Sequence, residues 1–170
     1  MCGISGFFLL NNFSTHRESL QTLRNMTNVL RHRGPNASGY WSSEKDNIYL
    51  GHRRLSIIDL SETANQPMHS NNGRYIIIFN GEIYNFKKLK NELKSAFNVK
   101  FKTQSDTEVL LELIVQFGFR KALDKIMGMF SLAVWDKKEK NLFLAIDPLG
   151  KKPLYWSVDD KNLIFASEIK

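Results

Sequence analysis

The chain has 170 residues, of which 42% are hydrophobic, a net charge of +7 and a single cysteine. This length and hydrophobic content suit one domain with its own core, over residues 1–170. One cysteine excludes an internal disulfide, no apolar run approaches the roughly 18 residues of a membrane span, and no signal peptide is evident. These features predict a cytoplasmic protein with no membrane partner.

Short apolar runs predict strands over residues 4–10, 47–52, 54–58, 75–79, 129–135, 141–146, 154–157 and 163–166. Apolar residues at helical spacing predict helices over residues 15–31, from Phe86 through Leu93, and over residues 105–117. Thr15 with Glu18, and Ser105 with Glu108, have the spacing of capping boxes. Helices grouped between runs of strands favour an α+β fold with antiparallel sheets.

Lysines gather within residues 87–94, 137–140 and 151–152. Such clusters occur in nucleic-acid-binding patches and also on the solvated faces of lysine-rich proteins. Aromatic residues are not interleaved with these lysines, and no known nucleic-acid motif accompanies them. We therefore expect solvated faces and no nucleic-acid partner.

Cys2 is the only cysteine and directly follows Met1. If Met1 is removed, the thiol and a free α-amine belong to one residue, which then holds both a nucleophile and a base. The α-amine titrates near neutral pH, below the thiol, so it can accept the thiol proton. A lone cysteine is otherwise a small buried hydrophobic residue, so its position alone leaves both interpretations open.

Each of four other segments can be interpreted either as part of a chemical site or as an ordinary structural feature. Asn80-Gly81 is typical of a tight hairpin turn, yet an asparagine amide beside a glycine N–H also suits an oxyanion hole. Arg54 offers a planar fork for a carboxylate, or it is a surface residue at a strand end. Asp106 suits a helix N-terminus, and residues 31–35 suit a helix stop.

Together these segments resemble the N-terminal class II glutamine amidotransferase domain, or glutaminase domain, of the glutamine-dependent asparagine synthetases. The matching segments, in family order, are residues 2–4, 31–35, 52–59, 80–85, 105–108, 128–130, 147–155 and 166–170. The resemblance covers the chain from end to end. It implies an N-terminal-nucleophile (Ntn) hydrolase fold, an α+β, four-layer αββα sandwich with two stacked antiparallel sheets.

The resemblance also implies the catalytic residues. Cys2 would attack the side-chain amide of glutamine, while Asn80 and the N–H of Gly81 would hold the oxyanion. Ammonia would leave, a glutamyl thioester would remain on Cys2, and water would release glutamate.

Substrate binding is implied in the same way. Arg54 would bind the α-carboxylate of glutamine, and Glu82 and Asp106 would bind its α-ammonium. The other implied residues are Ile57 and Ile58, whose backbone groups would line the pocket, and Arg33, which would support it.

For this domain the resemblance implies no cofactor and no metal. ATP and Mg²⁺ belong to a C-terminal synthetase domain, absent from this chain, which would receive the ammonia and be its partner beside glutamine. The chain closes without a stop signal, so we expect it to be cut from a longer protein. A homodimer is an option that the sequence leaves open.

Two positions depart from the family pattern. Ile146 stands where the family usually has arginine, and Pro148 stands where a basic residue is common. Both lie outside the implied glutamine site, so they bear on coupling to a partner domain. Two alternative functions remain: a related amidotransferase acting on another carboxylate, such as a sugar acid, and a non-catalytic module that kept the fold. The joint presence of Cys2, Asn80, Gly81, Arg54 and Asp106 argues against the second.

Overall fold

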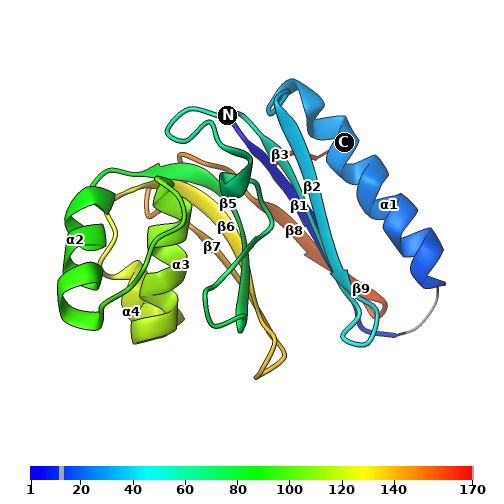
Figure 1. Ribbon diagram of the computed structural model, residues 1–170. Helices are drawn as coiled ribbons and strands as arrows, with labels where there is room; N and C mark the ends of the chain where they lie inside the picture. The colour runs from blue at the N-terminus through cyan, green and yellow to red at the C-terminus, as the bar shows by residue number, and fades with distance from the viewer. Residues whose placement is uncertain (12–13, 170) are drawn as a thin grey trace.

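In a computed structural model, which describes residues 1–11 and 14–169, two antiparallel sheets lie between helical layers (Figure 1). Residue 170, the last of the final matching segment, lies outside the described residues. The first sheet has the order β2-β3-β1-β9-β8, formed by β1 (Gly3–Leu9), β2 (Ala37–Ser43), β3 (Ile48–Arg54), β8 (Tyr155–Val158) and β9 (Asn162–Ala166). The second has the order β4-β5-β6-β7, formed by β4 (Met68–His69), β5 (Tyr75–Ile83), β6 (Gly128–Asp136) and β7 (Asn141–Ile146).

Helices cover the outer face of each sheet. Helix α1 (His16–Val29), which continues into a 3₁₀ turn (Leu30–His32), lies on the first sheet (Figure 1). The second sheet is covered by α2 (Phe86–Phe97), α3 (Asp106–Phe117) and α4 (Phe119–Leu123). A short 3₁₀ turn (Glu62–Ala64) precedes β4. The predicted α+β, αββα sandwich with two stacked antiparallel sheets is therefore confirmed.

The alternation of side chains along each strand divides the core into layers. On β5, Ile77 and Phe79 pack toward α2 and α3, whereas Ile76 and Ile78 pack into the space between the sheets. Trp135 is 1% exposed in that central layer. Successive strand residues point to opposite faces, so a strand covered on both sides is apolar throughout. This explains the continuous apolar runs in the sequence.

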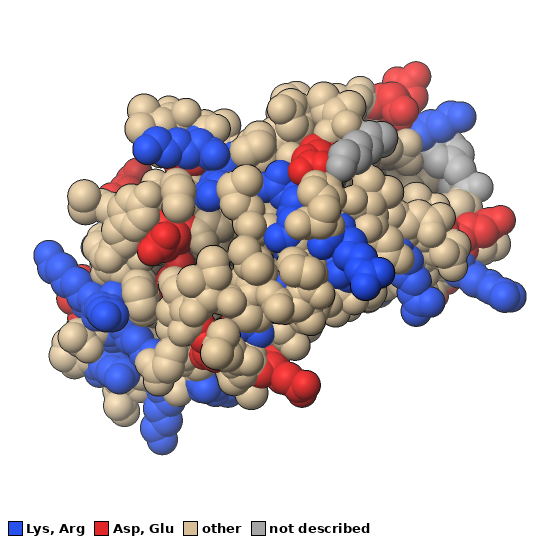
Figure 2. Space-filling model, turned by 90° about the horizontal axis from the view of Figure 1, so that it is seen from above, with Lys and Arg blue, Asp and Glu red and all other residues tan. Residues whose placement is uncertain are grey.

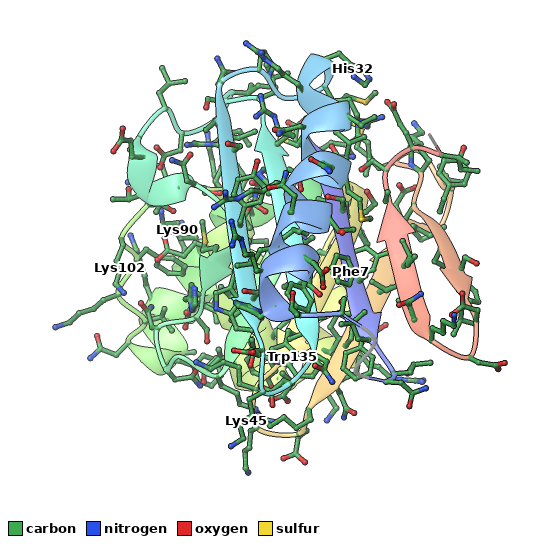
Figure 3. The ribbon with its side chains drawn as sticks, turned by 90° about the vertical axis from the view of Figure 1, so that its right-hand side faces the viewer. Phe7, His32, Lys45, Lys90, Lys102 and Trp135 are labelled. Atoms are coloured by element: carbon green, nitrogen blue, oxygen red, sulfur yellow. The ribbon has the colours of Figure 1, made fainter. Side chains whose placement is uncertain are left out.

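The third layer lies beneath α1. Phe7 stacks on Tyr49, with ring centroids 4.6 Å apart, and both pack against Leu23 of the helix. Figure 3 looks onto α1 with the first sheet behind it and labels Phe7. Among the described residues, no helix is long and apolar enough to cross a membrane.

Two capping boxes were predicted, and one is confirmed. The Thr15 hydroxyl accepts from the Glu18 N–H, and the Glu18 carboxylate accepts from the Thr15 N–H at 2.9 Å. At α3 the reciprocal bond is missing, so that prediction was wrong. Ser105 caps the Thr107 N–H, but the Glu108 carboxylate accepts from main-chain N–H groups of residues 102 and 103, because that loop folds back over the helix start.

The predicted strand over residues 54–58 is also wrong. A single strand, β3, ends at Arg54, and the chain then turns into a loop in which Ile57 is 74% exposed. Strand β2 was not predicted, because in its sequence, ASGYWSS, the two aromatic residues stand among small and polar ones. It pairs only with β3 and forms one edge of its sheet. An edge strand needs less apolar surface than a central one.

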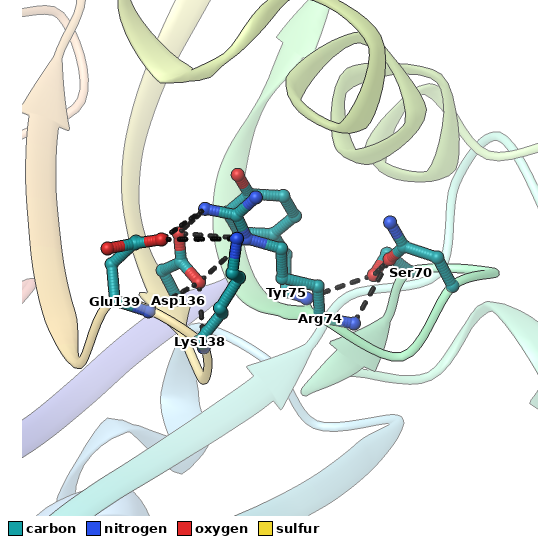
Figure 4. Close-up of polar contacts among 7 residues, drawn as sticks. Ser70, Arg74, Tyr75, Asp136, Lys138 and Glu139 are labelled. Atoms are coloured by element: carbon teal, nitrogen blue, oxygen red, sulfur yellow. Dashed lines mark hydrogen bonds and ion pairs between the residues drawn. The ribbon is translucent and has the colours of Figure 1, made fainter.

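An ion pair lies at the end of the second sheet that is farthest from Ile83. Arg74 donates from Nε and Nη2 to the Asp136 carboxylate, which also accepts the main-chain N–H of Lys138 (Figure 4). Burial alone raises the pKa of Asp136, but these hydrogen bonds outweigh it and hold the pKa below its usual range. The contacts join the turn before β5 to the hairpin between β6 and β7.

Charged side chains are distributed in a mixed way at the end of the molecule where the N-terminus lies. Figure 2 looks down on that end and shows basic and acidic groups interspersed with uncharged surface. The expectation that the lysine clusters form solvated faces is wrong at two positions. Lys90 is buried and donates to the Thr103 carbonyl and to Gln104, and Lys152 is buried in the candidate site.

Candidate active site

The candidate site lies where the layer between the two sheets ends. Strand alternation places Ile4 of β1, Leu50 of β3 and Ile78 of β5 in that layer. Cys2 precedes Ile4 by two residues, Arg54 follows Leu50 by four, and Asn80 follows Ile78 by two. All three side chains therefore share the inward direction, although they come from distant parts of the chain.

These residues line a pocket of about 290 Å³. It contains every site residue predicted from the sequence except Arg33, namely Cys2, Arg54, Ile57, Ile58, Asn80, Gly81, Glu82 and Asp106. The remaining lining residues are Met1, Leu55, Asp59, Ala64, Gln66, Phe79, Ser105, Thr107, Met129 and Lys152. No group of histidine, cysteine, aspartate or glutamate within the described ranges has the arrangement of a metal site.

The Cys2 thiol contacts the main chain of Leu55. Its Sγ accepts the Leu55 N–H at 3.4 Å and lies 3.7 Å from the Leu55 carbonyl oxygen. Burial raises the thiol pKa above its ordinary value, and this effect outweighs the Leu55 N–H and the positive charges of the N-terminus and Arg54. The resting thiol is protonated at neutral pH, so attack by its sulfur requires a base.

Asn80 and Gly81 lie within β5 rather than in a turn. The register pairs Asn80 with Ser131 and Gly81 with Phe130 on β6, which excludes the hairpin interpretation. The Asn80 amide is 1% exposed and donates to the Ser131 hydroxyl across a long distance of 3.4 Å. At Gly81, a Cβ would collide with the main chain of β6, so glycine is required by the close approach of the two strands.

Arg54 is a buried cation whose hydrogen-bond acceptors within the described chain are all uncharged. Its Nη1 donates to the Ser61 carbonyl and to the Asn65 amide oxygen, both at 2.7 Å, and its Nη2 donates to the Asp59 carbonyl. These acceptors are all neutral. Among the described residues the guanidinium forms no salt bridge, and its Nε and one N–H of Nη2 have no acceptor.

Asp106 is the matching buried anion. Its carboxylate is 4% exposed, accepts the Ile83 N–H at 2.9 Å and forms no salt bridge with any described residue. Burial raises the pKa of Asp106 above its usual range despite the hydrogen bonds from main-chain N–H groups, and the charge of Glu82 raises it further. Glu82 lies exposed at the rim of the same pocket.

Arg33 lies behind the pocket. Its Nε donates to the Cys2 carbonyl at 2.9 Å, and its Nη1 binds Glu168 at 2.9 Å. Ile57 and Ile58 lie in the loop after β3, and both line the pocket.

The sequence did not predict several residues that lie at the site. Gln66 accepts the Phe79 N–H at 2.6 Å, and Ser131 contacts Asn80. Lys152 lines the pocket and is 8% exposed. Ser131 had a usable signal, because it is a polar residue inside an apolar run. Lys152 had none, since its neighbour Lys151 is exposed and the pair looks like a solvated turn.

His52 links the two sheets behind the pocket. It is fully buried, and its Nε2 donates to the Phe79 carbonyl at 3.1 Å, one residue before Asn80. Its Nδ1 is buried without a hydrogen-bond partner in the described chain. Burial lowers the pKa of His52 to about 4, with the charges of Arg53 and Arg54 adding to the effect. The ring is therefore neutral at physiological pH.

We expect His52 to make the fold sensitive to acid. The unfolded chain binds a proton near the ordinary histidine pKa, whereas the folded chain does not, so stability falls as pH drops below about 6.5. The loss between pH 7.5 and pH 5 should be about 2 kcal/mol. Urea unfolding of wild type and His52→Gln, which can still donate to the Phe79 carbonyl, isolates this contribution. An equal acid loss in the two proteins would contradict it.

This αββα architecture is that of the Ntn-hydrolase fold, with a cysteine next to the N-terminus at the end of the sheet sandwich. A family model described as a glutamine amidotransferase domain matches residues 1–170. The chain belongs to this glutamine amidotransferase family, a class of enzymes.

Similar proteins with curated names support the same family. The chain is 40% identical over 170 residues to glutamine-hydrolysing asparagine synthetase 1 of Bacillus subtilis, covering 100% of this chain and 26% of that protein. It is 36% identical over 177 residues to amidase chry2 of Gibberella zeae, covering 100% of this chain and 26% of that protein. The chain thus spans about a quarter of the length of these curated relatives, at their N-terminal part for the synthetases.

A solved structure shares the fold. Glutamine phosphoribosylpyrophosphate amidotransferase from Bacillus subtilis superposes with a TM-score of 0.79 at 22% identity, covering 98% of this chain and 42% of that chain. At this identity the likeness concerns the fold alone.

Proposed function

We propose that this domain hydrolyses glutamine to glutamate and ammonia through Cys2. The observation that carries the proposal is the pairing of opposite charges in one pocket. Arg54 and Asp106 are both buried, neither forms a salt bridge with a residue that the structure describes, and both line the cavity that holds Cys2. A buried charge is costly unless it is paired, so the pocket favours a ligand with a carboxylate and an ammonium, which is the head group of an amino acid. Release of glutamate and ammonia from glutamine tests the proposal directly.

In the proposed reaction, the free α-amine of Cys2 takes the thiol proton, and the sulfur attacks the side-chain carbonyl carbon of glutamine. Asn80 and the Gly81 N–H stabilise the oxyanion. The amine-bound proton passes to the leaving nitrogen, ammonia departs, and a thioester remains. Water then attacks the thioester, glutamate leaves, and the sulfur regains its proton.

Substrate positioning follows from the charges. Arg54 offers Nε and Nη2 to the α-carboxylate, while Asp106 and Glu82 receive the α-ammonium. The main chain at Ile57 and Ile58 closes the pocket on the loop side. Arg33 holds the Cys2 carbonyl and thereby fixes the nucleophile, a role supported by their 2.9 Å hydrogen bond.

This mechanism requires removal of Met1. The N-terminal ammonium lies 3.3 Å from the Arg33 carbonyl, and while Met1 is present the Cys2 nitrogen is an amide and not a base. We expect the mature protein from its own host to lack one methionine, which intact-mass analysis measures. A protein that retains Met1 and keeps normal glutaminase activity would contradict the amine mechanism.

We expect strong selection of glutamine over asparagine. Pocket size alone separates such a pair by about 10–200-fold, and misplacement of the amide by about 1 Å adds about a hundredfold. With the head group held by Arg54 and Asp106, asparagine should be hydrolysed at least about a thousandfold less efficiently. Arg54→Lys should lower kcat/KM for glutamine despite its retained charge, because lysine lacks the planar fork.

The matched measurement compares kcat/KM for both amides in wild type, Arg54→Lys and Lys45→Arg, an exchange outside the pocket. Equal use of asparagine by wild type, or an Arg54→Lys protein with wild-type kcat/KM, would mean that the head-group clamp is wrongly assigned.

We further propose that residues 1–170 are the glutaminase domain of a longer, cytoplasmic protein. A synthetase domain using ATP and Mg²⁺ would receive the ammonia, and this domain itself would use no cofactor. Relatives named as asparagine synthetases support aspartate as the acceptor. The similarity to an amidase supports the alternative that the acceptor is a different carboxylate. Adding candidate carboxylates to the full-length protein with ATP and glutamine distinguishes the two.

A further inference from the structure

Lys152 is held rigidly by the turn after β7. Its main-chain N–H donates to the Asp147 carboxylate at 3.1 Å, and the same carboxylate accepts the N–H groups of Leu149, Lys151 and Phe130. Asp147 is 2% exposed, so the turn is anchored to β6 from within. The position of Lys152 at the pocket is therefore part of the fold.

The ammonium of Lys152 is buried, and its hydrogen-bond partner within the described chain is not an anion. Its Nζ donates to the Met1 thioether sulfur at 3.0 Å, and among the described residues it forms no salt bridge. Sulfur in a thioether is a weak acceptor. The side chain lines the same pocket as Cys2, so a positive charge is kept beside the nucleophile with only a poor partner.

Removal of Met1, which the proposed function requires, deletes that partner. It also exposes the α-amine of Cys2, which is linked to Lys152 Nζ in the unprocessed chain through Met1 and its 3.0 Å sulfur contact and belongs to a residue lining the same pocket. A neutral amine has a lone pair that can accept a hydrogen bond from an ammonium, whereas a protonated amine is repelled by it. The two charge states of the amine therefore interact with Lys152 in opposite ways.

We propose that Lys152 keeps the α-amine of Cys2 in its neutral, proton-accepting form by holding a fixed positive charge beside it. The inference rests on the proposed function, in which that amine takes the thiol proton. Lys152 is a positioning residue in this scheme, because it acts through the amine and not on glutamine.

Other charged groups also act on the amine. Arg54 strengthens the effect of Lys152, and the pocket carboxylates oppose it. Arg33 and Glu168 lie behind the Cys2 carbonyl with His32, and His52 is neutral deeper in the core. The pocket carboxylates are Asp59, Glu82 and Asp106. All of these groups are unchanged in a Lys152 variant, so the difference from wild type reports Lys152 alone.

The kinetic test is the pH dependence of kcat/KM for glutamine in the processed full chain. Lys152→Met removes the charge at similar length, Lys152→Arg keeps it, and Lys151→Met removes the neighbouring exposed charge as a control. For Lys152→Met we expect the acidic limb of the pH profile of kcat/KM to move to higher pH by about one unit. This is a roughly tenfold loss of activity at a given pH on that limb. Activity on the alkaline plateau should stay close to wild type, and the limb should not move in the other two variants.

A second measurement does not depend on activity. In the Cys2→Ala background, the rate of acylation of the N-terminal amine by acetic anhydride is followed against pH by mass spectrometry. The amine should react at lower pH with Lys152 present than in Lys152→Met. Intact mass confirms Met1 removal, and circular dichroism confirms folding, in every variant.

The outcomes separate the proposals. If both the acidic limb and the acylation profile stay unchanged in Lys152→Met, the inference is overturned while the glutaminase function stands. A rise in KM with an unmoved limb assigns Lys152 to substrate binding and also overturns it. If wild type releases no glutamate, the proposed function fails, and the acylation profile still decides whether Lys152 acts on the amine.

Discussion

Replacing Cys2 by alanine is expected to abolish glutamate release, with a loss of at least about 10⁴-fold, since removal of a nucleophile eliminates the covalent step. Alanine is also small, so removal of Met1 should proceed as in wild type. Glutamine binding should persist, because Arg54 and Asp106 are untouched. Labelling by a diazo-ketone analogue of glutamine should disappear together with activity.

Glutamate release, calorimetric glutamine binding and mass-detected labelling, made on one preparation, check this expectation. Within the described residues the sulfur hydrogen-bonds only with the main chain of Leu55, so its removal should disturb few polar contacts. Turnover at a rate comparable to wild type would mean that Cys2 is not the nucleophile. Loss of binding would instead place the thiol in substrate recognition.

The second large effect is expected at Asn80. Loss of one oxyanion donor typically lowers the rate by about a hundred- to a thousandfold, or roughly 3–4 kcal/mol. Asn80→Ala should therefore lower kcat far more than it raises KM. The reason is that charge on the substrate oxygen develops only as the sulfur attacks, so the amide contributes most in the transition state.

Ser131→Ala is the matched control for Asn80→Ala. It removes the 3.4 Å hydrogen bond to the Asn80 amide and leaves the amide itself in place. We expect a much smaller change in kcat from this control, and denaturant unfolding of both variants separates lost activity from lost stability. A change confined to KM in Asn80→Ala would make Asn80 a ground-state contact.

The residues that line the pocket could be recognised from the sequence only as a group. Arg54 alone is compatible with a surface arginine, and Asp106 alone with a helix start. Their significance comes from lying in one cavity, with no salt bridge to any residue that the structure describes, and the spacing along the sequence does not express this. The resemblance supplied the grouping in the sequence, and the geometry brings together all the predicted residues, with Arg33 just behind the cavity.

Local patterns predicted the elements that depend on local physics. The helix from Thr15 and its capping box, the strands around Ile4 and Ile76, and the α+β class follow from periodicity and from side-chain hydrogen bonds within one turn. Patterns failed where distant partners decide. Strand β2 pairs with β3, and Leu55, the first residue after β3, donates its N–H to the Cys2 sulfur.

The sequence by itself therefore determined the alternating apolar strands, the first helix and the identity of the chemical groups. Only the tertiary structure decided that Asn80-Gly81 is strand and not turn, because β6 supplies its hydrogen-bonding partner. The same holds for Lys152, whose main chain is held by Asp147 and whose buried ammonium contacts Met1. Burial and pairing are properties of segments far apart in the chain, so they exist only once the two sheets have packed together.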